Sequence, residues 1–232
     1  MVYFVGAGTG APDLITVRGR RYLEQADVII YAGSLVNPEL LSYAKKDCEI
    51  FNSATMTLEE VIAVMERAEQ EQKMTVRLHT GEPSIYGAVR EQMDILDEKG
   101  ISYESCPGVS ACFGAAASLN LEYTLPGISQ SLIITRMAGK TPVPERESIE
   151  SFAAHGASMA IYLSTGRLGE LTERLVAACG SCIQGDLAGG GSISLYAGRT
   201  GRDCACTQYH KDCARPRRRG GRASKLRALK AV

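Results

Sequence analysis

The segment Thr75–Asp97 constrains the fold of this chain more than any other. It begins with a short apolar strand, continues into a polar turn over 79–84, and then shows the apolar spacing of a helix over Ile85–Asp97. Gly81 allows a close approach of the backbone to a ligand, and Pro83 fixes φ where the helix is expected to begin. Because the first N–H groups of a helix lack intrahelical partners, the segment predicts a ligand-binding turn at the carboxyl end of a strand.

The rest of the chain alternates strands and helices in the same way. Buried apolar runs at Val2–Val5, Val28–Tyr31 and Ile101–Glu104 read as strands, and helical patterns separate them. Such alternation indicates a largely parallel sheet with right-handed crossovers, whose ligands bind beyond the carboxyl ends of the strands. We predict an α/β fold with two α/β domains, an N-terminal one over 1–119 and an incomplete C-terminal one over 120–180.

Length and composition set the class of protein. A chain of 232 residues can hold two modest domains with proper cores. Its N-terminus has no basic region before the first strand, so no signal peptide is expected. The longest run of small and apolar residues, near Phe113–Leu121, is interrupted by Ser118 and Asn120 and is too short to cross a bilayer. We therefore expect a cytoplasmic protein without a membrane partner.

A glycine-rich turn over Val5–Gly10 follows the first strand and invites a dinucleotide interpretation. Its glycines lack the third position of the Rossmann spacing, and the second strand ends in Tyr31-Ala32-Gly33 without a carboxylate for a ribose. Plain turn formation explains these glycines as well. The chain also contains no phosphate-binding GxxxxGK[ST] sequence and no HExxH pair, so nucleoside triphosphate and metallohydrolase chemistry are unsupported.

The net charge of zero hides an asymmetry between the body and the tail of the chain. Residues 1–180 carry a charge of −8 and residues 181–232 carry +8, and five of the eight cysteines lie between Cys179 and Cys213. One interpretation is a zinc knuckle that includes His210, followed by an arginine run over 215–219 that binds nucleic acid. The other is that neither feature was selected for.

Three motifs occur in a fixed order along the body of the chain. They are VGAGTGAPDLITVRG at 5–19, TGEPSIYG at 80–87 and CPGVSA at 106–111. Together they resemble the signatures of the tetrapyrrole methyltransferases of the corrin pathway. Three longer stretches are similar to the precorrin-4 C11-methyltransferase branch of that family: YAGSLVNPELL at 31–41, RLHTGEPSIYGAVREQMD at 77–94 and ITRMAGKTPVPE at 134–145.

The resemblance implies S-adenosyl-L-methionine held in a cleft between two α/β domains. It implies methyl transfer to C11 of precorrin-4 or cobalt-precorrin-4 in cobalamin biosynthesis, by a homodimer with no metal of its own and no nucleic-acid partner. Thr9, Glu82 and Ala111 stand where the family commonly has proline, aspartate and serine. Carried over onto this sequence, the cofactor contacts fall at Pro12, Thr80, Gly81, Glu82, Ser110, Ala111, Leu163 and Ser164.

Methyl transfer from a sulfonium requires orientation more than a protein nucleophile, so no catalytic residue is assigned. The macrocycle carries many carboxylates, and we place Arg136 and Lys140 against them, with Tyr31 and Tyr86 near the pocket. Two alternatives stay open: another precorrin or uroporphyrinogen methyltransferase, and an inactive tetrapyrrole-binding remnant.

The family's pattern breaks off after Gly180. A further strand with a motif like ATWP is expected there, yet the chain contains no tryptophan. One permitted spelling of residues 184–189, CAG GGC GAC CTG GCC GG, encodes Arg-Ala-Thr-Trp-Pro when read one base later. A frameshift near codons 179–183 would explain the charge, the cysteines and the lost periodicity. We therefore predict a truncated C-terminal domain and an aberrant, disordered tail over 181–232.

Overall fold

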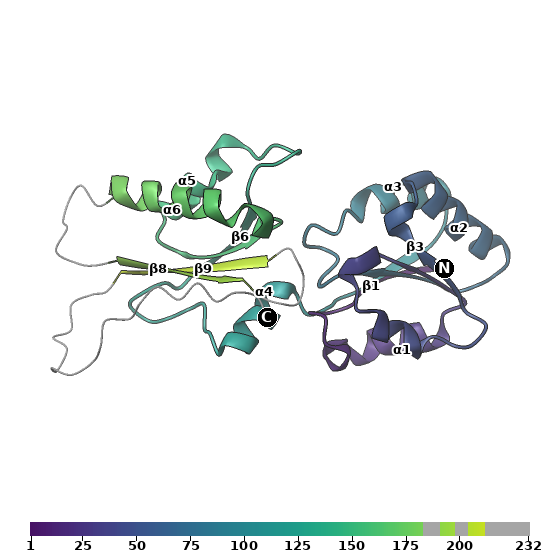
Figure 1. The fold of residues 1–232 in the computed structure, drawn as a ribbon. Coiled ribbons are helices and arrows are strands. Elements are labelled where there is room, and N and C mark those ends of the chain that lie inside the picture. The colour runs from purple at the N-terminus through teal and green to yellow at the C-terminus, as the bar shows by residue number, and fades with distance from the viewer. Residues whose placement is uncertain (183–190, 198–203, 212–232) are drawn as a thin grey trace. The chain divides into compact units, whose positions relative to one another are not determined.

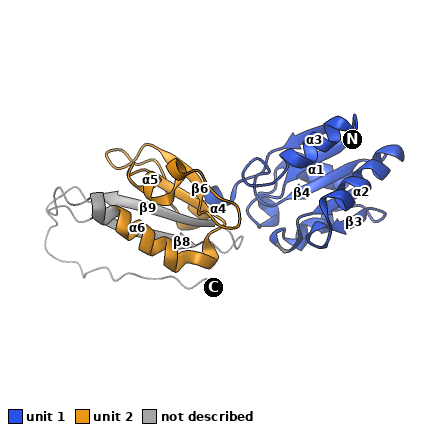
Figure 2. Cartoon of the chain, turned by 90° about the horizontal axis from the view of Figure 1, so that it is seen from above, with its two compact units in different colours: residues 1–114 blue, residues 115–232 orange. Residues whose placement is uncertain are grey.

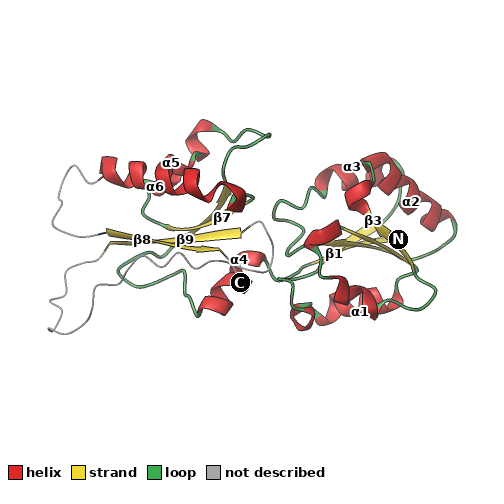
Figure 3. Cartoon of the chain, viewed as in Figure 1, coloured by secondary structure: helices red, strands yellow, loops and turns green. Residues whose placement is uncertain are grey.

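The structure, a computed structural model of the whole chain, describes residues 1–182, 191–197 and 204–211. The chain divides into two compact units, Met1–Gly114 and Ala115–Val232 (Figure 2). The division falls inside helix α4 (Ala111–Leu119), shortly before the boundary at 119 that the sequence predicts. Strands and helices alternate in both units, which confirms the α/β class (Figure 3).

The first unit is built on a five-stranded sheet in the order β3-β2-β4-β1-β5. Every neighbouring pair in this sheet is parallel, as the crossover pattern predicts. The strands β4, β1 and β5 therefore lie side by side, and the loops after them emerge at one edge. The strands are β1 (Val2–Gly6), β2 (Val28–Tyr31), β3 (Glu49–Asn52), β4 (Thr75–His79) and β5 (Tyr103–Cys106).

Helices cover both faces of this sheet, which is why its central strands are apolar runs. Figure 1 shows α2 and α3 on one side of the sheet and α1 on the other. The first core packs Phe4 and Ile30 against Met65 of α2 and Leu96 of α3. The second core contains Leu23 and side chains of the opposite sheet face. The helices are α1 (Val17–Gln25), α2 (Leu58–Gln70) and α3 (Arg90–Glu98).

Helix α3 begins at Arg90, so the prediction of a helix from Ile85 is wrong. Tyr86 and Ala88 adopt φ values of 55° and 50°, in the left-handed region that a right-handed helix excludes. The turn after β4 therefore continues as an irregular loop to Val89. The amides of this turn are consequently not the N-terminal amides of a helix, which corrects the expectation from the sequence.

The second unit contains a four-stranded sheet in the order β6-β7-β9-β8. β6 (Leu132–Arg136) and β7 (Ser158–Tyr162) are parallel. Helices α5 (Ile149–Ala153) and α6 (Leu168–Cys182) pack together over the sheet (Figure 1). Their buried core is formed by Met137, Ile149, Met159, Ile161, Leu171 and Leu175.

Strands β8 (Gly191–Ala197) and β9 (Cys204–Lys211) lie within the segment for which the sequence predicts disorder. They form an antiparallel pair, and β9 also pairs antiparallel with β7. The run SISL at 192–195 alternates polar and apolar residues, a pattern typical of a strand. The expectation of disorder therefore does not describe these two segments.

Residues 183–190, 198–203 and 212–232 lie outside the described part of the chain, and so do the side chains of the cysteine-rich segment. The zinc interpretation, the arginine run and the proposed shift point fall on these residues. Within the part that the structure does describe, no three His, Cys, Asp or Glu side chains gather as metal ligands. The same residues include no helix that is both long and apolar enough to cross a bilayer.

Candidate functional site

The loops that follow β1, β4 and β5 meet at one point on the edge of the first sheet. A Cβ placed on Gly6 would lie 2.5 Å from the carbonyl oxygen of Gly81 and 2.6 Å from Cα of Gly108. A Cβ on Gly108 would lie 2.8 Å from Cα of Gly6. Side chains larger than hydrogen are excluded at such distances. One glycine from each of the three sequence motifs therefore brings three backbones into direct contact.

Backbone hydrogen bonds join the first two of these loops. The Gly8 N–H donates to the Gly81 oxygen at 3.3 Å, and the Gly81 N–H donates to the Gly8 oxygen at 3.0 Å. Both glycines have left-handed φ values, 76° and 62°, that other residues adopt only with strain. The glycine-rich turn over 5–10 therefore serves to pair with the turn after β4, which agrees with the turn-forming interpretation of its sequence.

Glu82 joins the second loop to the third. Its Oε2 accepts a hydrogen bond from the Gly108 N–H at 2.8 Å, and its Oε1 accepts one from the Ser84 N–H at 3.0 Å. Hydrogen bonds from amides to a carboxylate are stronger than those between neutral groups. The sequence predicts Glu82 as a cofactor contact, and the structure shows both of its oxygens bonded within the chain.

The third motif also lies close to Gly81, through Ser110 and Ala111. A Cβ on Gly81 would lie 3.6 Å from the Ala111 nitrogen and 3.9 Å from Cα of Ser110. Ser110 is buried, and Ala111 is the first residue of α4. The structure therefore brings Thr80, Gly81 and Glu82 of the second motif close to Ser110 and Ala111 of the third. The two groups lie about 30 residues apart in the sequence.

Two buried polar atoms at the end of β4 have no hydrogen-bond partner among the described residues. They are Nε2 of His79 and Oγ1 of Thr80. A buried polar group without a partner costs about 1–3 kcal/mol, so such atoms are rare in native proteins. Their position beside the contact of Gly6, Gly81 and Gly108 is where a ligand with hydrogen-bonding groups would satisfy them.

His79 is neutral at physiological pH. Burial, together with the nearby positive charge of Arg77, lowers the pKa of its imidazole to about 3. A neutral imidazole offers one N–H donor and one nitrogen acceptor, so His79 suits an uncharged hydrogen-bonding group of a ligand. Nothing in the sequence marks His79 as part of a site, because a lone histidine carries no signal of its burial.

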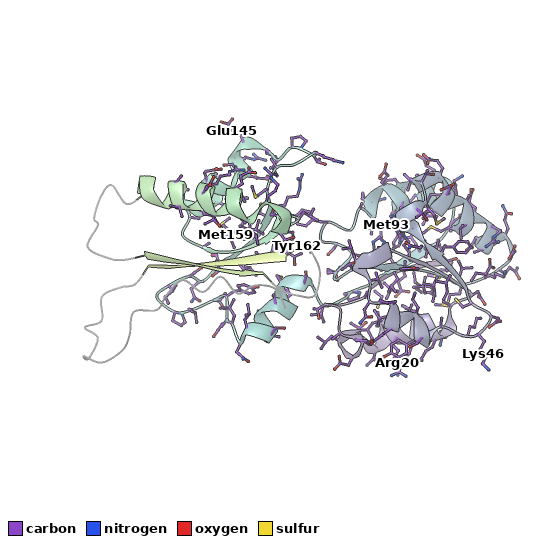
Figure 4. All side chains as sticks on the ribbon, in the orientation of Figure 1. Arg20, Lys46, Met93, Glu145, Met159 and Tyr162 are labelled. Carbon is purple, nitrogen blue, oxygen red and sulfur yellow. The ribbon has the colours of Figure 1, made fainter. Side chains whose placement is uncertain are left out.

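Pro12 begins a short 3₁₀ helix over Pro12–Leu14, after the glycine-rich turn. It lines a surface hollow of about 460 Å³ together with Arg20, Arg21 and Tyr43. The Arg20 guanidinium lies over the Tyr43 ring, 4.6 Å from its centroid. Figure 4 places Arg20 on the α1 side of the unit.

The remaining predicted residues of the first unit lie near the same sheet edge. Tyr31 is the last residue of β2 and is half-buried, and Tyr86 is 44% exposed in its left-handed conformation.

In the second unit, Leu163 and Ser164 follow the carboxyl end of β7. Leu163 is exposed and has a left-handed φ of 53°. The buried Ser164 hydroxyl donates to the Tyr162 oxygen at 2.7 Å and accepts from the Met137 N–H at 3.2 Å. Ser164 thus ties the loop after β6 to the end of β7, so its hydroxyl is already used within the chain.

Arg136 holds the loop that follows β6. Its guanidinium donates to the carbonyl oxygens of Met137, Thr141 and Pro142 at 2.9–3.3 Å. Lys140, on the same loop, is exposed. The sequence placed both side chains against substrate carboxylates; in the structure Arg136 binds carbonyl oxygens and Lys140 faces solvent.

Comparison with known proteins agrees with this arrangement. Residues 1–184 match the family model for tetrapyrrole (corrin/porphyrin) methylases. The chain belongs to this family. The cobalt-precorrin-4 C(11)-methyltransferases of Methanocaldococcus jannaschii and Priestia megaterium are 54% and 46% identical to it, over 175 and 163 residues.

These matches cover 75% and 70% of the chain, which spans 68% and 63% of the two relatives, about two thirds of their length. Among solved structures, a cobalt-precorrin-4 methyltransferase of cobalamin biosynthesis superposes with a TM-score of 0.79 at 34% identity. That superposition covers 89% of this chain and 94% of the other. It therefore reaches beyond residue 184, where the family match ends.

We expect the stability of the first unit to depend on the protonation of His79. The imidazole takes up a proton below pH 6.5 in the unfolded chain, but only near pH 3 in the folded chain. The free energy of unfolding should therefore fall by up to about 1.4 kcal/mol per pH unit between these values as the pH is lowered. Urea unfolding from pH 7 to pH 4 measures this slope.

The variant His79→Gln should have a flatter slope than the wild type, because it has no buried imidazole to protonate. Equal slopes for the wild type and His79→Gln would contradict the burial of a neutral imidazole.

We expect Glu82→Ala to loosen the contact between the second and third motifs. The substitution leaves the Gly108 and Ser84 amides without their acceptor, which should cost about 1–3 kcal/mol of stability and speed hydrogen exchange at Gly108. Amide exchange followed by NMR checks this. Glu98→Ala, at an exposed position of α3, is the matched control; equal exchange at Gly108 in both variants would exclude the link.

Proposed function

We propose that this chain transfers a methyl group from S-adenosyl-L-methionine to C11 of precorrin-4 or cobalt-precorrin-4 in cobalamin biosynthesis. The observation that carries the proposal is the graded similarity within the family. Identity is 54% to a cobalt-precorrin-4 C(11)-methyltransferase and 34% to a uroporphyrinogen-III C-methyltransferase. Regiochemistry follows the shape of the substrate pocket, so the more similar branch is the better guide to the carbon that is methylated.

The loops at the edge of the first sheet fit a ligand such as S-adenosyl-L-methionine. Three glycines bring the backbones close, and the buried Oγ1 of Thr80 and Nε2 of His79 lack partners within the described chain. The adenine, ribose and amino-acid groups of this ligand offer donors and acceptors to such atoms. When bound, it supplies an electrophilic methyl group on sulfur.

In this proposal Thr80 and Gly81 hold the ligand from the second motif, and Ser110 and Ala111 hold it from the third. Glu82 positions the binding loops rather than contacting the ligand, because its carboxylate oxygens accept hydrogen bonds from the Gly108 and Ser84 amides. Pro12, Leu163 and Ser164 remain proposed contacts by resemblance. Leu163 offers an exposed apolar side chain, together with the backbone N–H and C=O that every residue except proline carries.

The side chains around the substrate orient it for an in-line transfer. Lys140 is exposed and free to reach a carboxylate of the macrocycle. Arg136 reaches substrate carboxylates only from the edge of its guanidinium that the loop carbonyls leave open. Tyr31 and Tyr86 offer ring faces near the macrocycle. We further propose that the protein is a cytoplasmic homodimer.

The test is incubation of the purified full-length chain with S-adenosyl-L-methionine and cobalt-precorrin-4. The proposal expects a product heavier by one methyl group, with the new carbon at C11 by ¹³C NMR. A methyl group at another carbon would favour another member of the family. Binding of the tetrapyrrole without any methylated product would favour the inactive remnant instead.

We expect Arg136→Ala to weaken binding of the tetrapyrrole macrocycle rather than binding of the cofactor. Loss of a charge-assisted hydrogen bond of about 1.5–3 kcal/mol should raise the KM for the tetrapyrrole roughly ten- to a hundredfold, with the KM for S-adenosyl-L-methionine nearly unchanged. Steady-state kinetics with each substrate varied in turn measures this split. Arg146→Ala, at a side chain that is 87% exposed, is the control. Unchanged kinetics in Arg136→Ala would exclude a role for Arg136 in binding the substrate and leave it only the role of shaping its loop.

A further inference from the structure

The first unit contains a buried positive charge that the proposed function does not use. Arg77 lies in the middle of β4, between Phe4 of β1 and Ile30 of β2, and only 7% of it is exposed. This face of the sheet is the apolar core beneath α2 and α3. Among the described residues, no carboxylate pairs with the guanidinium. A buried charge without a counter-ion is costly, so its retention calls for a specific role.

The guanidinium of Arg77 donates hydrogen bonds to one backbone carbonyl group and to one side chain. Its Nη1 donates to the Ile30 oxygen at 3.2 Å, and its Nε donates to Oε1 of Gln92 at 3.0 Å. Gln92 belongs to α3 and is itself 5% exposed. Figure 4 labels its neighbour Met93 on the same helix. The bond from Arg77 fixes which way the Gln92 amide faces, because the guanidinium accepts no hydrogen bond and must meet the amide oxygen.

The fixed amide then bonds to the loop that precedes the helix. Nε2 of Gln92 donates to the carbonyl oxygen of Ala88 at 3.0 Å. Ala88 has a left-handed φ of 50°, two residues after Tyr86 with a φ of 55°. Such conformations are strained for residues other than glycine and persist only where surrounding contacts hold them. Gln92 is the side chain that holds this end of the strained segment.

The opposite end of the same loop is held by Glu82. The Ser84 N–H donates to its Oε1, and the Ile85 N–H donates to its carbonyl oxygen at 3.1 Å. The loop over 82–89 is thus anchored at one end to the contact of the three motifs and at the other to the core of the sheet. Between the two anchors lies Tyr86, with 44% of its surface exposed.

We propose that Gln92, oriented by the buried Arg77, is a positioning residue for the segment Tyr86–Ala88. It holds the left-handed residues Tyr86 and Ala88 in the geometry required for methyl transfer to the tetrapyrrole. The role in catalysis rests on the proposed function, whereas the holding of the loop does not. A displacement of about 1 Å in a positioning element can cost a hundredfold in rate, so a single buried amide is sufficient to matter.

The decisive variant is Gln92→Glu. A glutamate keeps an oxygen for Nε of Arg77 and adds a counter-ion for its charge, but its carboxylate cannot donate to the Ala88 oxygen. Gln92→Leu removes both bonds. Gln70→Glu makes the same chemical change at an exposed position of α2 and is the matched control.

We expect Gln92→Glu to fold with a Tm close to that of the wild type. Amide exchange over residues 85–89 should be at least about tenfold faster than in the wild type, and kcat/KM for cobalt-precorrin-4 should fall about ten- to a hundredfold. The Kd for S-adenosylhomocysteine should change less than twofold, because Thr80 and Gly81 precede the displaced segment. Gln92→Leu should reproduce the loss, and Gln70→Glu should match the wild type in all three measurements.

Unchanged exchange over 85–89 in Gln92→Glu would overturn the proposal, because the loop would then hold without the amide donor. Faster exchange with unchanged kcat/KM would overturn its catalytic part. If the wild type itself methylates nothing, the proposed function fails, and the exchange measurement still decides whether Gln92 holds the loop.

Discussion

The candidate site depends on the contact of three backbones at Gly6, Gly81 and Gly108. Hydrogen atoms in place of side chains let the loops after β1, β4 and β5 approach to distances that any Cβ would forbid. The paired amides of Gly8 and Gly81 and the Glu82 carboxylate then lock the contact. Because the three strands are neighbours in a parallel sheet, their carboxyl ends share one edge, and the loops have only to be small enough to meet.

This contact leaves little freedom to the segment that leads from β4 to α3. The segment begins at the shared edge and ends on a helix that packs on the sheet's core, so both of its ends are fixed by tertiary structure. Its left-handed residues Tyr86 and Ala88 are stabilised by Glu82 on one side and Gln92 on the other. The buried Arg77 links this arrangement to the centre of the sheet. Strand, loop and helix thus form one connected network of polar contacts.

The second unit uses arginine and serine for the same purpose. Arg136 binds three carbonyl oxygens of the loop after β6, and Arg167 also donates to the Ala138 oxygen of that loop. Ser164 joins the start of the loop to the end of β7. Arg136, which the sequence analysis places against substrate carboxylates, therefore serves first to shape a loop. A guanidinium makes up to five hydrogen bonds, so shaping the loop and binding a carboxylate are compatible roles.

Periodicity and turn chemistry predicted the class of the fold and most of the strands, and the resemblance of three ordered motifs to a known family predicted the family. Both signals are available in sequence because apolar spacing and motif order are properties of the chain itself. They also placed the residues of the three motifs at strand ends, including Thr80, Gly81, Ser110 and Ala111. The short strand β3 escaped prediction, since an edge strand is stabilised by pairing rather than by its own pattern. The strands β8 and β9 were missed for another reason: the charge and cysteine content of the tail favoured disorder, although residues 192–195 alternate like a strand.

The roles of Glu82, Arg77 and Gln92 could be decided only by tertiary structure. A carboxylate next to a ligand-binding turn looks like a ligand contact in sequence, and a charged residue in a strand looks like a surface charge. Burial and hydrogen-bond partners give each its role, and both depend on residues distant in the chain: Gly108 for Glu82, and Ile30 and Gln92 for Arg77. The start of α3 was decided in the same way, because the loop before it follows its two anchors rather than its helical propensity.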